Sequence, residues 1–213
     1  LPFAIDNSGN YYLLLRHGYS QINNPENFVL KHNDIPVTDT MVSNTYAGYY
    51  ILKFDSNFNF QYIKPITECV HSPYWGLNVD FYDMECDSED NIYFSGYVQI
   101  SDTAANPIYP YDVELADNKH IYIHNDGRHG VVLKMNSNGE ILWANQARNY
   151  GIYGKSDFQN MILDENYGNV YISGFAFPIS PLYSGNYTVI GDNDTIINNY
   201  TGEYANYREL TYI

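Results

Sequence analysis

Apolar and polar residues alternate most clearly over residues 130–147, which read GVVLKMNSNGEILWANQA. One face of the first half of this segment carries Val131, Leu133 and Met135. The polar stretch at 136–139, Asn-Ser-Asn-Gly, has the residue types that tight turns require, and a second apolar stretch follows it. The segment therefore predicts a β-hairpin.

Two strand-turn-strand patterns recur along the chain. Residues 50–57, YILKFDSN, match residues 131–138, VVLKMNSN, so Lys53 and Lys134 are equivalent at a spacing of 81 residues (134 − 53). The second pattern is FAIDNSGNYYLLL at 3–15, MECDSEDNIYFSG at 84–96 and MILDENYGNVYISG at 161–174. The first aspartate of each copy is Asp6, Asp87 or Asp164, and the spacings are 81 residues (87 − 6) and 77 residues (164 − 87). Because two motifs share one offset, the chain contains an internal repeat of short strands, as propellers and other all-β arrays do.

Each repeat unit is predicted to hold four antiparallel strands, A to D, so the expected fold class is all-β with β-propeller-type blades. The A strands are expected at 3–6, 81–87 and 158–164, and the B strands at 10–15, 91–98 and 169–176. The C strands are expected at 49–54 and 130–135, and the D strands at 59–64 and 140–147. The units span 1–66, 79–148 and, incomplete, 156–213, which makes a partial propeller of about two and a half blades. Insertions between B and C are predicted to form hairpins at 113–124 and 188–198.

The phrases ILDENYGNVYISGF and GVVLKMNSNGEILWANQA resemble the bacterial seven-bladed β-propeller repeats of the SBBP type. Those repeats combine an aspartate, a Gly-Asn turn and an apolar-Tyr-apolar strand with an apolar-x-Lys hairpin that ends in Trp. The first unit departs from the pattern, with Phe58 at the turn glycine, Tyr62 at the tryptophan and Leu14-Leu15 at Ser-Gly. The resemblance implies a propeller fold and a place in a large secreted or cell-surface protein, but it implies no reaction.

The charge balance excludes several partners. Ten Lys and Arg against 25 Asp and Glu give a net charge of −15, which repels polyphosphates and anionic lipids, so we expect no nucleic-acid partner. No apolar run approaches the roughly 20 residues of a membrane span, so we expect no membrane insertion. Cys86 occupies an apolar strand position equivalent to Ile5 and Leu163, which favours a buried thiol, while a disulfide with Cys69 stays open.

Candidate metal ligands are few. His124 and His129 can approach each other across the intervening turn, and the alternative is that both are solvated on a hairpin. The acidic turns 87–90 and 192–194 have the oxygen density that calcium prefers, but not the spacing of an EF-hand loop. Asx-turns explain these aspartates more simply. We therefore predict no cofactor and leave only calcium open.

Carboxylates support an enzymatic alternative. A propeller brings acids from several A strands to a central channel, and glycoside hydrolysis needs two carboxylates. The acids on or before the second and third A strands are Asp80, Asp83, Glu85 and Asp157. Because no nucleophile–base pair can be located, we predict no catalytic residue and keep a carbohydrate-active hydrolase or lyase as the alternative. The two repeated lysines are interpreted as structural, with a repeated anion contact as the alternative.

Aromatic loop residues are the preferred binding candidates. In a propeller the D-to-A and B-to-C connections emerge on one face, so a shared surface is predicted for His71, Tyr74, Trp75, Tyr150 and Tyr153. Exposed tyrosine and tryptophan rings suit sugar rings and protein partners, although such loops can also simply pack on one another. We predict a non-catalytic binding or structural module, extracellular or on the cell surface, that presents this aromatic face to a carbohydrate or a protein.

The repeat also predicts a core between consecutive units. Burial is expected at the equivalent positions Phe3/Met84/Met161, Ile5/Cys86/Leu163, Tyr50/Val131, Leu52/Leu133 and Phe54/Met135. A partial propeller leaves apolar sheet faces uncovered, so we expect further blades of the same polypeptide, with ring closure by other copies as the alternative. In the first case, the strand at 210–213 would continue beyond this sequence.

Overall fold

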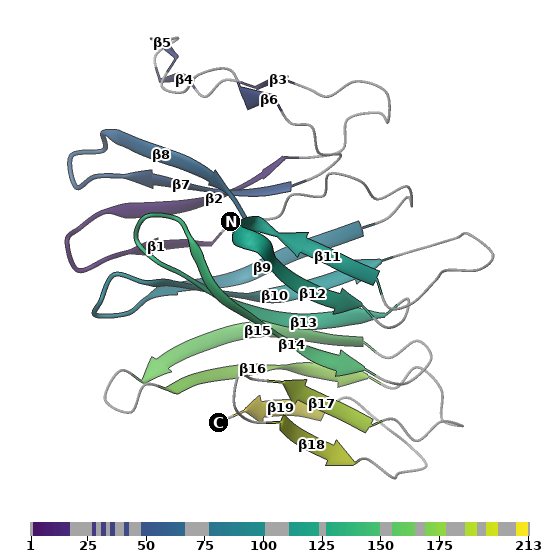
Figure 1. Ribbon diagram of the computed structural model, residues 1–213. Coiled ribbons are helices and arrows are strands. Elements are labelled where there is room, and N and C mark those ends of the chain that lie inside the picture. The colour runs from purple at the N-terminus through teal and green to yellow at the C-terminus, as the bar shows by residue number, and fades with distance from the viewer. Residues whose placement is uncertain are drawn as a thin grey trace.

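The computed structural model describes residues 2–17, 27–28, 31–32, 35–36, 41–42, 48–66, 77–100, 111–123, 127–149, 155–164, 169–177, 186–190, 195–199 and 208–212 (Figure 1). These residues form antiparallel β-sheets, and the one helical element among them is a single 3-10 turn, η1 (Ala116–Asn118). The all-β fold class is therefore confirmed. Within the described ranges, no helix is long and apolar enough to cross a membrane.

Sheet one is a four-stranded antiparallel sheet. Its strands, in spatial order, are β1 (Phe3–Ile5), β2 (Tyr11–His17), β7 (Gly48–Phe54) and β8 (Phe60–Pro65). They are the predicted A, B, C and D strands of the first unit, in the predicted order. The insertion between β2 and β7 holds two small ribbons, formed by β3 (Asn27–Phe28) with β6 (Met41–Val42) and by β4 (Lys31–His32) with β5 (Ile35–Pro36).

Sheet two repeats this order and then extends it. Its first four strands are β9 (Leu77–Cys86), β10 (Ile92–Ile100), β13 (Arg128–Met135) and β14 (Ile141–Asn149). The predicted hairpin of the third unit, β17 (Asn186–Ile190) with β18 (Thr195–Asn199), pairs with the outer edge of β14. The predicted hairpin of the second unit, β11 (Tyr111–Leu115) with β12 (Lys119–Ile123), forms a separate ribbon.

Sheet three has three strands, β15 (Lys155–Asp164), β16 (Asn169–Phe177) and β19 (Arg208–Tyr212). Strand β19 pairs with β16 and so occupies the place of a C strand, as predicted for the end of the chain. The described residues form no closed sheet.

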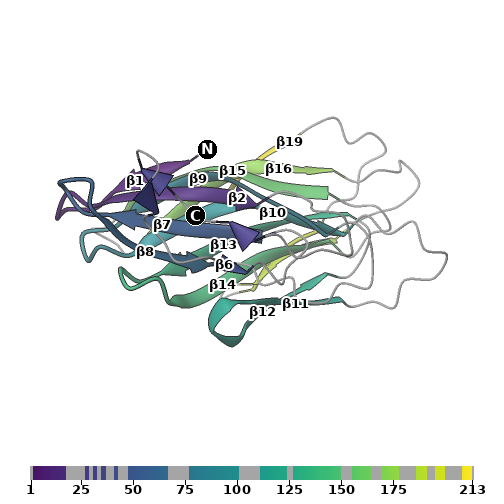
Figure 2. The same ribbon diagram turned by 90° about the horizontal axis from the view of Figure 1, so that it is seen from above.

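The three sheets lie one on another (Figure 1), and their first strands, β1, β9 and β15, lie along one side of the stack (Figure 2). The ribbon β11–β12 lies on the opposite side (Figure 2). The tight turns that join β1 to β2, β7 to β8, β9 to β10 and β13 to β14 all lie at one end, here called the turn end (Figure 1). The opposite end, where β9, β13 and β15 begin, is called the loop end.

The tight turns share one Asx pattern. A side chain at the first position accepts a hydrogen bond from the backbone N–H four residues on: Asp6 from Asn10 (2.8 Å), Asp55 from Asn59 (2.9 Å), Asp87 from Asn91 (2.8 Å) and Asn136 from Glu140 (3.0 Å). The fourth position of each turn has a positive φ, at Gly9, Phe58, Asp90 and Gly139. Glycine adopts this backbone without steric penalty, whereas Phe58 adopts it with its ring stacked on Tyr11 at 4.3 Å.

Two equivalent β-bulges interrupt the first strands of sheets two and three. The pairing of β9 with β10 skips Tyr82, and that of β15 with β16 skips Gln159. Opposite the bulges stand Gly96 and Gly174, where a Cβ atom would overlap a carbonyl oxygen of the first strand. The Ser-Gly of the repeat is therefore required by the close approach of two backbones.

The main core lies between sheets one and two. Sheet one contributes Ala4, Tyr12, Leu14, Tyr49 and Ile51, and sheet two contributes Phe81, Met84, Ile92, Phe94, Val131, Leu133 and Met135. A second core joins sheets two and three through Tyr93, Val132, Ala147, Phe158, Met161 and Ile172. Alternate residues of β10 and β13 thus bury against different neighbours, as the two-residue period of a strand requires.

Burial between units is confirmed for Met84, Val131, Leu133 and Met135 in the first core and for Met161 in the second, while Phe54, Cys86 and Leu163 are half-buried. Tyr50 and Leu52 are also buried, but they belong to neither of these two cores. The prediction is wrong for Phe3 and Ile5. Phe3 and Ile5 are 61% and 50% exposed. Both lie on the face of sheet one that points away from sheet two, and no described sheet covers them there.

Candidate functional site

Aromatic and charged side chains gather at the loop end of the stack. They come from β7, β9, β10, β13 and β15, and are here called the loop-end cluster: Tyr49, Asp80, Tyr82, Tyr97, Arg128 and Asp157. Since the five strands belong to three sheets, the cluster exists only in the folded stack.

Arg128 is the centre of this cluster. Its Nη1 donates to Oδ2 of Asp157 at 2.8 Å, its Nε donates to Gln99 at 3.2 Å, and its guanidinium lies 4.2 Å from the ring centroid of Tyr97. Burial lowers the pKa of Arg128, but the hydrogen bond and charge of Asp157 outweigh it and hold the pKa above its usual value. The guanidinium therefore stays charged and rigidly oriented, with about a third of the side chain exposed to solvent.

Tyr82 is the exposed aromatic member of the cluster. As the extra residue of the β9 bulge it is turned out of the strand pairing, and its ring lies 5.7 Å from that of Tyr97. Burial of the hydroxyl raises the pKa of Tyr82, so the phenol remains a neutral hydrogen-bond donor. Deeper in the cluster, Tyr49 donates to Asp80 at 2.6 Å. The result is an exposed ring beside a fixed guanidinium, a combination suited to binding polar ring compounds.

The predicted ligand-binding residues His71, Tyr74, Trp75, Tyr150 and Tyr153 lie outside the described residues. The chain leads to them from the loop end, because segment 67–76 joins β8 to β9 and segment 150–154 joins β14 to β15. Their role in binding stays a prediction.

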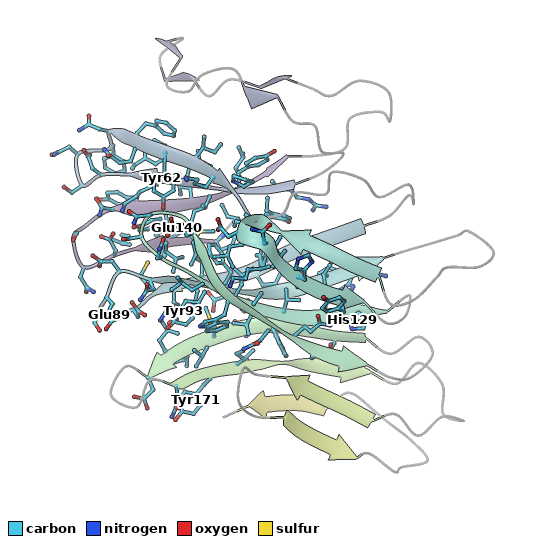
Figure 3. All side chains as sticks on the ribbon, viewed as in Figure 1. Tyr62, Glu89, Tyr93, His129, Glu140 and Tyr171 are labelled. Atoms are coloured by element: carbon cyan, nitrogen blue, oxygen red, sulfur yellow. The ribbon has the colours of Figure 1, made fainter. Side chains whose placement is uncertain are left out.

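The structure describes only one residue of the predicted metal pair, His129. His129 is fully buried in β13, opposite Val98, and lies at the loop end (Figure 3), whereas His124 lies outside the described residues. The structure, where it is described, contains no group of three or more His, Cys, Asp or Glu side chains that could hold a metal. Of the acidic turns, 192–194 is not described, and the turn at 87–90 uses its carboxylates in hydrogen bonds to Asn7, Ser8 and Asn91.

The four candidate acids all make contacts between sheets. Asp83 accepts the N–H of Met161 at 2.8 Å, and Glu85 accepts that of Leu163 at 3.2 Å, so both join β9 to β15. Burial raises the pKa of Glu85, although the N–H of Leu163 works against this shift. Asp80 and Asp157 belong to the loop-end cluster. These contacts supply a structural role for each carboxylate, and the enzymatic alternative stays a prediction.

The repeated lysines lie at the turn end. Lys134 pairs with Asp87 at 3.2 Å and lies over the ring of Tyr93, as the structural interpretation predicts. Lys53 instead donates to the carbonyl of Ser137 in the next unit at 3.2 Å. Figure 3 shows Tyr62 and Tyr93 at this end of the stack. The lysines thus stabilise the repeat and its stacking.

Cys86 is a free, half-buried thiol. Burial raises its pKa to about 12, so the reactive thiolate is not formed at neutral pH. This agrees with the structural interpretation of the residue.

No protein-family model matches this chain, and no curated protein shows significant similarity to it. The site therefore has to be interpreted from its own geometry. Sequence reasoning missed Tyr82, Tyr97 and Arg128, and the one available signal was the repeated Ser-Gly, since a glycine within a strand often marks a bulge.

Proposed function

We propose that this chain is a non-catalytic binding module of the β-propeller type, built of SBBP-like repeats, from an extracellular or cell-surface protein. Its ligand is a carbohydrate, held by the loop-end cluster together with the aromatic residues predicted for binding in segments 67–76 and 150–154. The observation that supports the proposal is the ring of Tyr82, which is 38% exposed at a β-bulge and lies beside the stacked Arg128 and Tyr97. Sugar rings stack on such aromatic faces, and their hydroxyl groups accept hydrogen bonds from a guanidinium.

The test is a glycan array followed by calorimetry on Tyr82→Ala and Trp75→Ala variants. Each substitution should weaken the affinity for the selected glycan about tenfold, because removing a central aromatic contact costs roughly 1 kcal/mol or more. The melting temperature should stay nearly unchanged.

Tyr122→Ala is the matched control, because Tyr122 and Tyr82 are both 38% exposed but Tyr122 lies on β12, away from the cluster. Its substitution should leave the affinity unchanged. Absence of any glycan binding by the native chain would overturn the proposal. Hydrolysis of an arrayed glycan would favour the carbohydrate-active enzyme instead.

A further inference from the structure

Part of the outer face of sheet one is apolar, exposed and not covered by any described sheet. Phe3 and Leu13 pair across β1 and β2, Ile5 pairs with Tyr11, and the ring of Tyr11 stacks on that of Phe58. The exposed Phe3, Ile5, Leu13 and Phe58, with the half-buried Tyr11, are here called the free face. On the same side of sheet one, Tyr50 and Leu52 are buried, so the exposed part is formed by β1, β2 and the turn that holds Phe58.

The repeat shows what this face is built to contact. Eighty-one residues further on (84 − 3 and 94 − 13), Met84 and Phe94 occupy the positions of Phe3 and Leu13. Met84 is 4% exposed against 61% for Phe3, and Phe94 is 0% exposed against 43% for Leu13. The difference arises because sheet one covers Met84 and Phe94. An equivalent sheet would cover the free face in the same way.

The chain carries the complementary surface at its other end. In sheet one the residue that faces sheet two is Ala4, whose equivalents in the next two sheets are Glu85 and Ile162 (85 − 4 = 81 and 162 − 85 = 77). Glu85 faces sheet three, and Ile162 is 66% exposed on the outer side of sheet three, opposite the buried Met161. The surface around Ile162 is therefore the one with which the stacking would continue.

We propose that the free face is a docking surface for a second copy of this chain, which presents the outer side of its sheet three. The contact continues the two interfaces that already exist within the chain, sheet one on sheet two and sheet two on sheet three. The contact joins two different surfaces of the chain and is therefore head-to-tail. Successive copies joined in this way close into a ring or extend into a filament. Large exposed apolar patches favour such association.

The experiment is sedimentation velocity over a wide range of concentrations, on the native chain and three variants. The native chain should associate as its concentration rises. A Leu13→Ser/Phe3→Ser variant and an Ile162→Ser variant should each remain monomeric. Leu142→Ser is the matched control, because Leu142 is similarly exposed but lies on β14 outside both surfaces, and it should associate like the native chain. Circular dichroism checks that all variants fold, and Ile5→Ser replaces the double variant if that one does not.

A mixture of the two monomeric variants tests whether the contact is head-to-tail. Each monomeric variant keeps one intact surface, so equimolar amounts of the two should form a dimer and no larger species. A native chain that stays monomeric at every concentration would overturn the proposal. So would an Ile162→Ser variant that dimerises by itself, because that result indicates free face on free face.

Discussion

Sheets one and two meet in a different kind of interface from sheets two and three. The first interface is mainly apolar, with aromatic contacts such as Tyr49 on Phe81 at 5.3 Å. The second has a smaller core, an ion pair between Arg128 and Asp157, and a carboxylate within the strands, Asp83, that accepts a backbone N–H of β15. Equivalent strands therefore stack by different means.

The cause lies in the residues that face the following sheet. Sheet one presents Ala4 and Leu14 to sheet two, whereas the equivalent residues of sheet two are Glu85 and Ser95. An apolar pair buries against the next sheet directly. A carboxylate at the same position has to find a hydrogen-bond donor, and the backbone of β15 supplies it. The repeat thus preserves strand order while leaving the chemistry of each interface free to vary.

The largest expected effect is in the first interface. Leu133→Ala removes a fully buried side chain from the main core, and should lower the free energy of unfolding by about 2–5 kcal/mol. Leu142→Ala, at an exposed position of β14, should change it by no more than about 0.5 kcal/mol. Urea denaturation measures both changes. Equal effects would contradict the placement of Leu133 in the core and of Leu142 at the surface.

Breaking the ion pair should affect the second interface. Arg128→Met leaves the buried carboxylate of Asp157 without its charged partner, and should cost about 1–3 kcal/mol. Adding Asp157→Asn should restore part of the loss, because no uncompensated charge then remains. Hydrogen exchange should show increased opening of sheet three before sheet one. Faster exchange in sheet one alone would contradict the assignment of the Arg128–Asp157 pair to the interface between sheets two and three.

Acid should act in opposite directions on the Asx turns and on Glu85, which joins sheets two and three. Burial raises the pKa values of Asp6 and Asp87, but hydrogen bonds, chiefly from Asn10 and Asn91, outweigh it and hold both below the usual value. Their stabilisation is therefore present above the unfolded-state pKa, about 4, and is lost as the pH falls through the lower folded-state values. Glu85 has the opposite sign, because its raised pKa favours folding as the pH falls. Asp6→Asn should flatten the acid limb of the stability curve, while Glu85→Gln should not.

The smallest effect should come from Ser95→Ala. The hydroxyl of Ser95 is buried, and it has no hydrogen-bond partner among the described residues. Removing an unsatisfied polar atom should change the free energy of unfolding by less than about 1 kcal/mol, toward greater stability. A clear loss of stability in thermal unfolding would indicate a hydrogen bond at this hydroxyl.

Much of the strand order could be predicted from the sequence, because the signals are local. Alternation of apolar residues along β13 and the Asx residues Asp6, Asp87 and Asn136 define hairpins within a few residues, and the 81-residue offset assigns them to equivalent places. Likewise the turn of β11–β12 could be predicted from its Asp-Asn pair. Each of these features depends on neighbours along the chain.

The tertiary structure alone decided which face of each sheet is covered and by what. Phe3 and Met84 have equivalent sequence contexts, yet one is exposed and the other buried, because sheet one lies against Met84 and no described sheet lies against Phe3. The pairing of β17 with β14 and the Arg128–Asp157 ion pair also depend on contacts between residues distant along the chain. A repeat specifies its own strands through local preferences, but the burial of its faces depends on which neighbour lies against them.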